Sequence, residues 1–466
     1  MGLFVASVGA IEDKMNATIC KRYVKRLLKP IPRSYGPDFR KWRTFLEDSQ
    51  WWGPERLQQY QDRELAKLIR HCYENVPYYQ DMFARLGLQP GDIQSKEDLH
   101  KLPCITKDEI RANANSLLAE NISLRSTESH TTGATTGTPL AVVLDKRTTA
   151  IRLAFEWRYY NWAGYRFGDP IAALRGRQVS SFEKGRRWEY DPHGNQLLLS
   201  AFDMSERNMS VYIEKLKEFK PKFVRGYPSN LSLLAQYARE KNLTISPNGM
   251  IRGLLTSSET LFPHQRDEIS KAFRSPVFDL YGNTEQAGRL GQCEIGRGYH
   301  DFVEHSVIEI LNPDHNGFGE IVATSLITYA MPLLRYRTGD MARLAGERCA
   351  CGRGLRLIAG LEGRKQDVAF MKDGTPLSLT AFFFAVHVPE MSQVRKIQFQ
   401  QDTPGQLRAL VVRGGDYIPG ACEKMLSSMN QNLPIPFDIE VRTVDDIPCT
   451  TAGKHRFFVS NVGNGY

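Results

Sequence analysis

The stretch "TTGATTGTPL", residues 131–140, combines small residues with hydroxyls, as a loop lying against phosphate would. Backbone N–H groups and threonine hydroxyls can hold an anion in such a turn. A Walker A loop, GxxxxGK[ST], carries in addition a lysine for the β and γ phosphates. This loop has no lysine, so we expect another part of the chain to supply the positive charge.

Three further stretches that carry chemistry follow in order along the chain. They are "YGNTE" at 281–285, "YRTGD" at 336–340 and "TAGKHRF" at 451–457. Each alone is weak evidence, because Gly/Thr-rich turns are usually only turns and a Gly-Lys pair near a C-terminus is usually a solvated loop. Their order and spacing indicate that they act together.

With these motifs the sequence resembles the adenylate-forming superfamily of acyl-CoA synthetases, adenylation domains and luciferases. Within it the sequence is similar above all to the phenylacetate-CoA ligase branch with the capsular-polysaccharide-biosynthesis (CapK-like) proteins. The resemblance covers nearly everything from about residue 45 onward, through "YENVPYY", "GYPSNLSLLA", "TSSET", "DLYGNTEQAG", "CACGRGL", "LEGR" and "AGKHRFF". It implies two steps: a carboxylate displaces pyrophosphate from ATP, and a second nucleophile captures the acyl-adenylate.

The resemblance implies which residues contact the phosphates. Thr284 would contact the α-phosphate, and Glu285 would hold Mg²⁺, a hard cation that prefers oxygen ligands. The alternative for Glu285 is a solvated acid at the start of a helix. The β and γ phosphates would be held by the loop residues Thr132, Gly133, Thr135, Thr136, Gly137 and Thr138.

The adenosine half would be bound by residues from four places in the chain. Asp340 would accept hydrogen bonds from the ribose hydroxyls, and Arg364 would touch the ribose or a phosphate in one orientation of the domains. Asp340 as a turn cap, Tyr281 as a core aromatic and Arg364 in an ordinary ion pair are the alternatives. The ring of Tyr281 would stack on adenine in a pocket made by Ser258, Glu259, Thr260, Tyr281, Gly282 and Asn283.

The resemblance places the missing positive charge on Lys454, in "TTAGKHRFF". This lysine would swing in with a small domain and bridge the substrate carboxylate and the phosphate in the first step only. Two departures from the family pattern stand out. Ala134 adds a methyl group where the backbone approaches phosphate, and Gln366 stands at the hinge position where an aspartate is common.

A second site is indicated by three cysteines and a histidine. Cys293 and His300 frame "CEIGRGYH", and Cys349 and Cys351 lie in "CAC". Three thiolates and an imidazole would close a tetrahedral Zn²⁺ site with no open position, so the site would be structural rather than catalytic. The alternative is that these thiols are small buried hydrophobic side chains.

Composition narrows the class of protein. The chain has 466 residues and a formal charge of +9. That charge suits anionic ligands such as nucleotides or CoA, but the sequence has no concentrated basic stripe with interleaved aromatics, so we expect no nucleic-acid partner. Eight scattered cysteines do not form a disulfide framework and favour the cytoplasm. Residues 20–30 would form either a peripheral membrane-surface helix or a solvated helix packed by its apolar side.

Alternating strand and helix patterns predict an α/β fold. We expect a helical lead-in over 1–125 that belongs to the N-terminal domain, and an adenylation core with mostly parallel sheets over 126–362. A small mobile α+β domain would occupy 363–466.

The sequence therefore predicts an ATP-dependent, AMP-forming ligase that activates a carboxylate and transfers the acyl group to CoA or an amine. Adenylyl transfer to a hydroxyl and a nucleotide-binding scaffold without turnover are the alternatives. The identity of the acid is not readable. Arg175, Arg177 and Arg225, in "ALRGRQ" and "RGYPSN", favour a polar or anionic acid, although arginines also commonly pair structurally.

Overall fold

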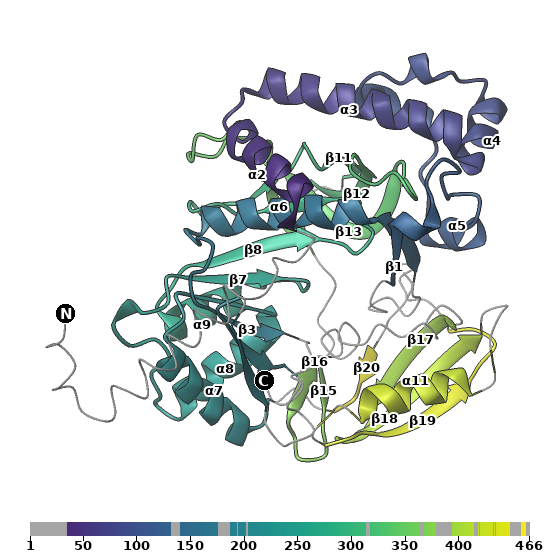
Figure 1. Cartoon of the computed structure of the whole chain (residues 1–466). Coiled ribbons are helices and arrows are strands. Elements are labelled where there is room, and N and C mark those ends of the chain that lie inside the picture. The colour runs from purple at the N-terminus through teal and green to yellow at the C-terminus, as the bar shows by residue number, and fades with distance from the viewer. Residues whose placement is uncertain are drawn as a thin grey trace, which may run out of the picture.

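The described chain contains a large mixed sheet of 12 strands, a smaller sheet of 4 strands and two 2-stranded sheets, with helices packed on the two larger ones (Figure 1). In this computed structural model the described residues are 35–131, 140–175, 187–192, 194–201, 204–313, 317–362, 368–378, 394–413, 418, 420–431, 433, 435–447 and 458–462.

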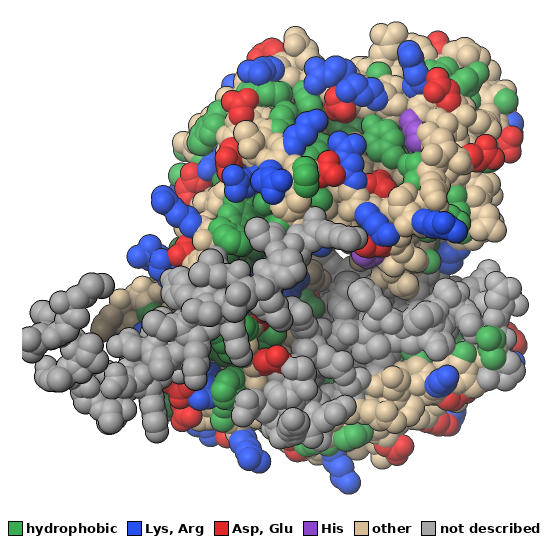
Figure 2. Space-filling view, in the orientation of Figure 1, with side chains coloured by type: hydrophobic (Ala, Val, Ile, Leu, Met, Phe, Trp, Pro, Cys, Tyr) green, Lys and Arg blue, Asp and Glu red, His purple; other side chains and the backbone are tan. Residues whose placement is uncertain are grey.

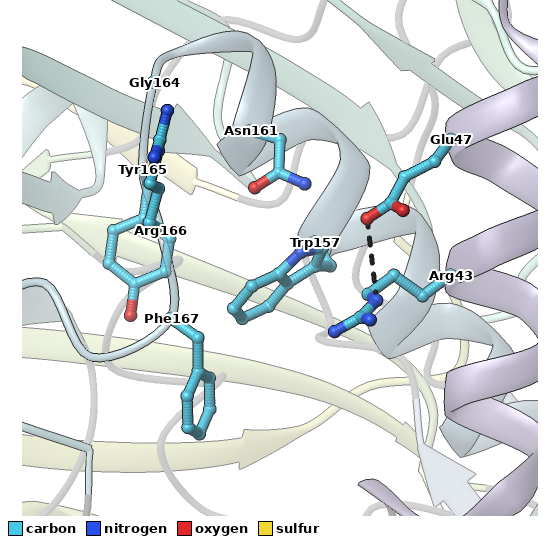
Figure 3. Close-up of a pocket in the computed structure, with 8 residues that line it drawn as sticks. All are labelled: Arg43, Glu47, Trp157, Asn161, Gly164, Tyr165, Arg166 and Phe167. Carbon is cyan, nitrogen blue, oxygen red and sulfur yellow. Dashed lines mark ion pairs between the residues drawn. The ribbon is translucent and has the colours of Figure 1, made fainter.

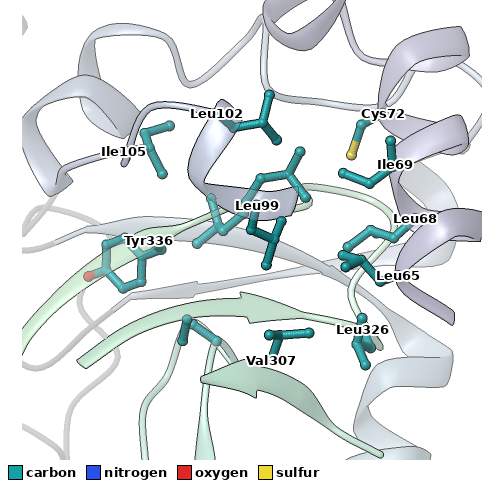
Figure 4. Close-up of a cluster of buried hydrophobic side chains, with 14 of the residues drawn as sticks. Leu65, Leu68, Ile69, Cys72, Leu99, Leu102, Ile105, Val307, Leu326 and Tyr336 are labelled. Atoms are coloured by element: carbon teal, nitrogen blue, oxygen red, sulfur yellow. The ribbon is translucent and has the colours of Figure 1, made fainter. Parts of the chain in front are cut away.

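The described part of the expected lead-in, from residue 35 onward, is helical. Helices α2 (Pro37–Ser49), α3 (Pro54–Asn75) and α4 (Pro77–Leu86) each begin with a proline, which lacks an N–H that the first turn would leave unbonded. The short helices η2 (Pro90–Asp92), η3 (Lys96–Lys101) and α5 (Lys107–Ala112) follow. One face of α3 is apolar at helical spacing, and Figure 4 shows Leu65, Leu68, Ile69 and Cys72 packed toward Val307 and Leu326.

The large sheet has the strand order β11-β12-β13-β14-β10-β9-β8-β7-β6-β3-β5-β4. Its parallel part is β3 (Ile171–Arg175), β5 (Gln196–Ser200), β6 (Phe223–Gly226), β7 (Gly253–Ser257) and β8 (Val277–Gly282). The antiparallel part is β4 (Trp188–Asp191), β9 (Arg289–Gly291), β10 (Tyr299–Asp301), β11 (Ser306–Leu311), β12 (Phe318–Ser325), β13 (Tyr336–Leu344) and β14 (Leu357–Glu362).

The α/β class is thus confirmed, but the sheet is mixed rather than mostly parallel. Helices connect β5 to β6, β6 to β7 and β7 to β8, whereas the described residues from β8 to β14 contain no intervening α-helix. Strands joined by short connections pair antiparallel, because a parallel pair needs a long crossover.

Both faces of the parallel strands are covered by helices. Alternate side chains serve the two faces: Phe223 and Leu255 pack toward α6 (Lys146–Trp162), whereas Val224 and Leu254 pack in the core with α7 (Glu206–Phe219), α8 (Pro228–Glu240) and α9 (Pro263–Phe273). In Figure 1, α6 runs beside β8, and α2 and α3 lie outside it. The remaining small elements are η4 (Leu124–Ser126), the hairpin β1 (Thr127–Thr131) with β2 (Ala141–Asp145), and η6 (Pro247–Gly249).

The C-terminal part has its own sheet and its own core. Strands β17 (Val394–Gln401), β18 (Gln406–Arg413), β19 (Asp438–Thr443) and β20 (Phe458–Ser460) form the order β19-β18-β17-β20, with α11 (Ala421–Asn430). The pair β15 (Val368–Phe370) and β16 (Pro376–Ser378) precedes them. The limits 1–125, 126–362 and 363–466, and the mobility of the last part, stay predictions.

The lead-in is fastened to residues far along the chain. Ser49 Oγ donates to Glu304 Oε1 at 2.6 Å, and the same buried carboxylate accepts from Arg158 Nη1 at 2.7 Å. Gln61 Nε2 donates to the carbonyls of Val303 and Ser306. Removing one partner of a buried ion pair is costly, because the other charge is then left buried without compensation. These contacts therefore hold α2 and α3 against the sheet.

The outer surface carries charges of both signs. Figure 2 shows Lys and Arg side chains interspersed with Asp and Glu over the face that bears α2, α3 and α6. No helix in the described part of the chain combines the length and the apolar character needed to cross a membrane.

Candidate functional site

The predicted adenine residues and Thr284, the predicted α-phosphate contact, meet where the parallel strands end. Ser257, the last residue of β7, lies beside Leu280 of β8, so 258–260 and 281–285 leave the same edge of the sheet. In open α/β sheets this carboxyl edge is where ligands bind. Thr284 and Asn283 are half-buried there, and the Asn283 side-chain nitrogen has no hydrogen-bond partner among the described residues.

Two tyrosines and two acids form a crossed pair at this edge. Tyr281 Oη donates to Asp340 Oδ2 at 2.9 Å, and Tyr336 Oη donates to Glu285 Oε1 at 2.6 Å. Each motif begins with the tyrosine that holds the acid at the end of the other motif. Burial and the Asp340 carboxylate raise the pKa of Tyr281 well above its ordinary value, so its hydroxyl stays a donor.

The start of β13 is positioned by the lead-in. Ile105 bridges to Tyr336, because its N–H donates to the Arg335 carbonyl at 3.0 Å and its carbonyl accepts from the Arg337 N–H at 2.9 Å. Arg335 in turn binds both oxygens of Glu309, at 2.8 and 3.0 Å. Later in the motif, Gly339 has φ +77°, a conformation that favours glycine and brings Asp340 round toward Tyr281.

Glu285 is a buried carboxylate with two partners. It is 5% exposed, and besides the Tyr336 hydroxyl it has the Lys107 ammonium 4.0 Å from Oε1. A buried charge needs such compensation. The alternative of a solvated acid is therefore excluded by the geometry. A carboxylate oxygen beside a phosphate site also fits Mg²⁺, which binds proteins through one or two carboxylates and keeps several waters.

Ser258, Glu259 and Thr260, which were also predicted to line the adenine pocket, are held by contacts that the prediction did not include. Glu259 accepts from the Ser229 N–H at 3.0 Å and from the Ser229 hydroxyl at 3.1 Å, so its carboxylate serves the N-terminus of α8. Ser258 has φ +73° and its hydroxyl accepts from Arg175 Nη2 at 3.2 Å. Thr260 lies beside them and is half-buried. Glu259 thus has a structural bond that the sequence did not reveal.

Several predicted residues lie outside the described part of the chain. They are Arg364, Lys454 and the phosphate-loop residues Thr132, Gly133, Thr135, Thr136, Gly137 and Thr138, together with Ala134, Arg177, Gln366 and the segment 20–30. Their roles stay predictions.

The predicted zinc ligands do come together. The Cys293 and Cys349 sulfurs are 3.6 Å apart, the Cys351 sulfur is 3.4 Å from His300 Nε2, and all four ligand atoms lie within 4.8 Å of one another. With ordinary Zn–S and Zn–N bond lengths, the edges of a tetrahedral site measure roughly 3.5–3.8 Å. The residues present therefore fit a tetrahedral zinc ion.

Burial sets the protonation state of His300, the histidine among these four candidate zinc ligands (the Cys/His cluster). Desolvation, helped by the nearby Arg353 charge, lowers the pKa of His300 to about 4, so the ring is neutral at pH 7. Its ring packs on Trp162 at 5.4 Å between centroids. Cys293 follows β9, His300 lies in β10, and the two remaining cysteines lie between β13 and β14.

The loop between β13 and β14, which carries Cys349 and Cys351, also binds the corner between α2 and α3. Gln50 Oε1 accepts from Arg353 Nε at 3.0 Å and from Trp162 Nε1 at 2.7 Å, and the Gly354 N–H donates to the Gln50 carbonyl. A Cβ atom on Gly354 would lie 1.9 Å from the Trp52 carbonyl oxygen, so only glycine fits there. The Cys/His cluster is thus packed directly under the lead-in.

A separate cavity of about 480 Å³ opens between α2 and the end of α6 (Figure 3). Its walls are Arg43, Glu47, Trp157, Asn161, Gly164, Tyr165, Arg166 and Phe167. None of the predicted nucleotide or metal residues lines it.

Sequence reasoning missed Tyr336 and Lys107. Tyr336 opens "YRTGD", so the motif itself was the signal, but only its acid was assigned a role. Lys107 follows Thr106, which caps α5 by accepting from the Glu109 N–H. Nothing in that local pattern connects Lys107 with Glu285, because the bridge between Ile105 and β13 is a long-range contact.

Comparison with known proteins finds relatives of this chain. A family model described as the CapK C-terminal domain matches residues 376–461. Protein CapK of Staphylococcus aureus is 23% identical over 410 residues, 86% of this chain and 89% of that protein. Phenylacetate-coenzyme A ligases of Thermus thermophilus and Escherichia coli are 25% and 26% identical; each alignment covers 68% of this chain, and 72% and 73% of those proteins.

Solved structures share the fold. A 2-hydroxyisobutyryl-CoA ligase in the postadenylation state aligns with a TM-score of 0.56 at 18% identity, covering 89% of this chain and 92% of that one. An open conformation of that ligase with 2-HIB-AMP and CoA gives 0.55 at 19% identity, covering 88% and 95%.

Proposed function

Because the chain is homologous to CapK and to the phenylacetate-coenzyme A ligases and has the fold of an acyl-CoA ligase, we propose that it is an ATP-dependent, AMP-forming ligase. It would activate a carboxylate as an acyl-adenylate and pass the acyl group to CoA. The crossed pairing of Tyr281 with Asp340 and of Tyr336 with Glu285 is the observation that carries the proposal. It brings an aromatic ring and two carboxylates together at one edge of the sheet, which is the set of groups that binding of adenine, ribose and Mg²⁺ would need.

Each residue has a distinct task in this proposal. Tyr281 stacks on adenine while its hydroxyl orients Asp340 toward the ribose. Thr284 donates to the α-phosphate, and Glu285, held by Tyr336, is the ligand for Mg²⁺. When bound, that ion supplies Lewis-acid neutralisation of phosphate charge. The hydroxyl-rich loop 132–138 binds the outer phosphates, and Lys454 adds the positive charge that the loop lacks. Arg364 would contact the ribose or phosphate.

We further propose that Cys293, His300, Cys349 and Cys351 hold a structural zinc ion. Four protein ligands leave no position for substrate, and the cluster sits under the α2–α3 corner rather than at the carboxyl edge of the parallel strands. Zinc here would stabilise the fold. Thiols kept free for a metal suit a reducing compartment such as the cytoplasm.

ATP–pyrophosphate exchange tests the central proposal. Purified protein with MgATP and labelled pyrophosphate should incorporate label into ATP only when a suitable acid is present, because exchange reports reversible adenylate formation. Aliphatic, hydroxy and aromatic acids form the panel. Adding CoA should then give a thioester, and replacing CoA with an amine tests the amide alternative. Adenylylated hydroxyl compounds would favour adenylyl transfer instead, and ATP binding without any acid-dependent exchange would favour a scaffold.

A further inference from the structure

Four arginines gather beside the candidate nucleotide site, on the α6 face of the sheet. Arg175 ends β3, Arg225 lies in β6, Arg289 begins β9, and Arg152 comes from α6. Glu156, one turn along α6 from Arg152, interacts with all four. In the described part of the chain this cluster therefore places four positive charges around one shared carboxylate.

The cluster touches residues of the predicted site directly. Arg175 Nη2 donates to the hydroxyls of Ser257 and Ser258 at 3.1 and 3.2 Å. Arg289 Nε lies 3.6 Å from the point where a Cβ atom of Gly282 would stand. The Arg289 guanidinium thus lies beside the glycine of "YGNTE", next to residues of the predicted nucleotide site.

The bonding capacity of these guanidinium groups is only partly used. Arg289 Nη1 donates to the Arg152 carbonyl at 3.1 Å, and its Nη2 lies 3.8 Å from Glu156. Its Nε, in a side chain that is 6% exposed, has no hydrogen-bond partner among the described residues. Arg225 donates to Gln196 Oε1 at 3.2 Å and to the Tyr160 hydroxyl at 3.4 Å, and its buried Nε likewise has no partner there.

Among the described residues, the positive charges of the cluster outnumber the one carboxylate that they share. Burial, together with the Arg152 charge, lowers the pKa of Arg289 to about 10 although Glu156 opposes the shift. Burial raises the pKa of Glu156, but attraction to Arg152 and the other arginines outweighs it. The carboxylate of Glu304 is already paired with the neighbouring Arg158, so it does not neutralise the cluster. An added anion would therefore be stabilised strongly here, because guanidinium groups bind carboxylate and phosphate oxygens through paired hydrogen bonds.

We propose that Arg175, Arg225 and Arg289 bind a second anionic group, a carboxylate or a phosphate, on the acid that is activated in the adjoining site. The inference rests on the proposed function. It excludes simple fatty and aryl acids as preferred substrates, since these would leave the cluster's charges without a counter-ion. The substrate class is thus an acid that carries a further negative charge at the end away from the reacting carboxylate.

Matched pairs of acids in the exchange assay test the inference. Glutarate is paired with valerate, 4-carboxyphenylacetate with phenylacetate, and 3-phosphonopropionate with butyrate, so that carboxylate and phosphate types are separated. At least one anionic member should exceed its neutral partner in kcat/KM by about tenfold or more. Arg225→Gln should lower the rate with that acid by roughly ten- to one hundredfold, the loss typical of a hydrogen bond to a charged group. Rates with the neutral acids should fall by a smaller factor, so that the preference for the anionic member of the pair is reduced.

Arg239→Gln is the matched control, because Arg239 is an exposed arginine on α8 whose partner, Glu268, lies on α9 away from the cluster. Its acid preference should equal that of the wild type. Preference for the neutral member in every pair, with exchange active, would overturn the inference and leave the proposed function standing.

A binding measurement distinguishes failure of the anion-site proposal from failure of the ligase proposal. Thermal unfolding with MgATP should show stabilisation by the anionic acids over their neutral partners, and Arg225→Gln should abolish that difference while keeping the stabilisation by MgATP alone. This outcome supports the anion site even if no acid drives exchange, in which case only the ligase proposal fails. Equal effects of both members of each pair would refute the anion site.

Discussion

The Tyr336 hydroxyl donates to Glu285 at 2.6 Å, although 51 positions separate the two residues. Tyr336→Phe removes this bond while keeping the ring. A hydrogen bond to a charged group contributes about 1.5–3 kcal/mol, so exchange should fall roughly ten- to one hundredfold and need more Mg²⁺ for half-maximal rate. A titration of exchange rate against Mg²⁺ measures both effects.

Tyr212→Phe is the control for this change. Tyr212 lies on α7, is also buried, and donates to the Ser200 carbonyl at 2.9 Å. That hydrogen bond does not involve Glu285, the predicted metal ligand. It should lose stability without altering the Mg²⁺ dependence. If Tyr336→Phe behaves in the same way, Tyr336 does not position Glu285 for the metal.

Asp340 gives a second expectation. Asp340→Ala should raise KM for ATP, since the ribose hydroxyls lose a charged acceptor that contributes about 1.5–3 kcal/mol. Tyr281→Phe, which frees Asp340 from its tyrosine but keeps the aromatic ring, should have a smaller effect in the same direction. Steady-state kinetics with varied ATP compare the two, and unaltered ATP dependence in Asp340→Ala would remove this residue from the nucleotide site.

Lys454 should matter for making the adenylate and hardly at all for consuming it. Loss of one preorganised donor at developing phosphate charge costs about 10²–10³ in rate, so Lys454→Ala should suppress exchange by at least that factor. Acyl transfer from a presynthesised acyl-adenylate to CoA should stay near normal. Gln366→Pro should instead slow the second step more, because proline fixes the φ angle that a hinge rotation changes. Wild-type exchange in Lys454→Ala would place the missing charge elsewhere.

The zinc proposal predicts about one equivalent of metal per chain, bound as in other four-ligand structural sites. Cys351→Ser should lower both the metal content and the melting temperature, since zinc binding contributes folding free energy directly. Cys72→Ser is a suitable comparison, because Cys72 is a buried thiol outside the cluster and its loss should affect stability but not metal content. A metal-free wild-type protein of unchanged stability would contradict the proposal.

His305 predicts how stability depends on pH. It is fully buried against Phe155, and burial together with Arg289 and Arg158 holds the pKa of its ring well below the ordinary value. Below the unfolded pKa of about 6.5 the unfolded state therefore binds a proton that the folded state does not. The free energy of unfolding should fall by up to about 1.4 kcal/mol per pH unit as the pH drops below 6.5. His305→Phe should reduce this slope, and the exposed His100→Gln should not.

Local patterns predicted much of this molecule because they are short in range. The apolar spacing of Leu65, Leu68 and Cys72 indicated α3. The acids that end "YGNTE" and "YRTGD" were singled out by the resemblance to a known family, and their roles stay predictions. What escaped prediction depends on the sheet order. The pairing of Tyr336 with Glu285 requires β13 to reach the edge of β8, and the hydrogen bond from Ser229 to the Glu259 carboxylate requires β7 to end beside α8. Sequence spacing carries no information about either contact.

The N-terminal helices α2 and α3 contact residues that are translated much later, and this affects folding during synthesis. Gln50 and its partner Arg353 are 303 positions apart, which corresponds to roughly 15–60 s of translation at ordinary ribosome speeds. For most of that interval Val307 and Leu326, toward which the apolar face of α3 packs, have not yet been made. Nascent chains that stop before Val307 should therefore expose this apolar face and tend to aggregate, although α3 is among the first helices to be made.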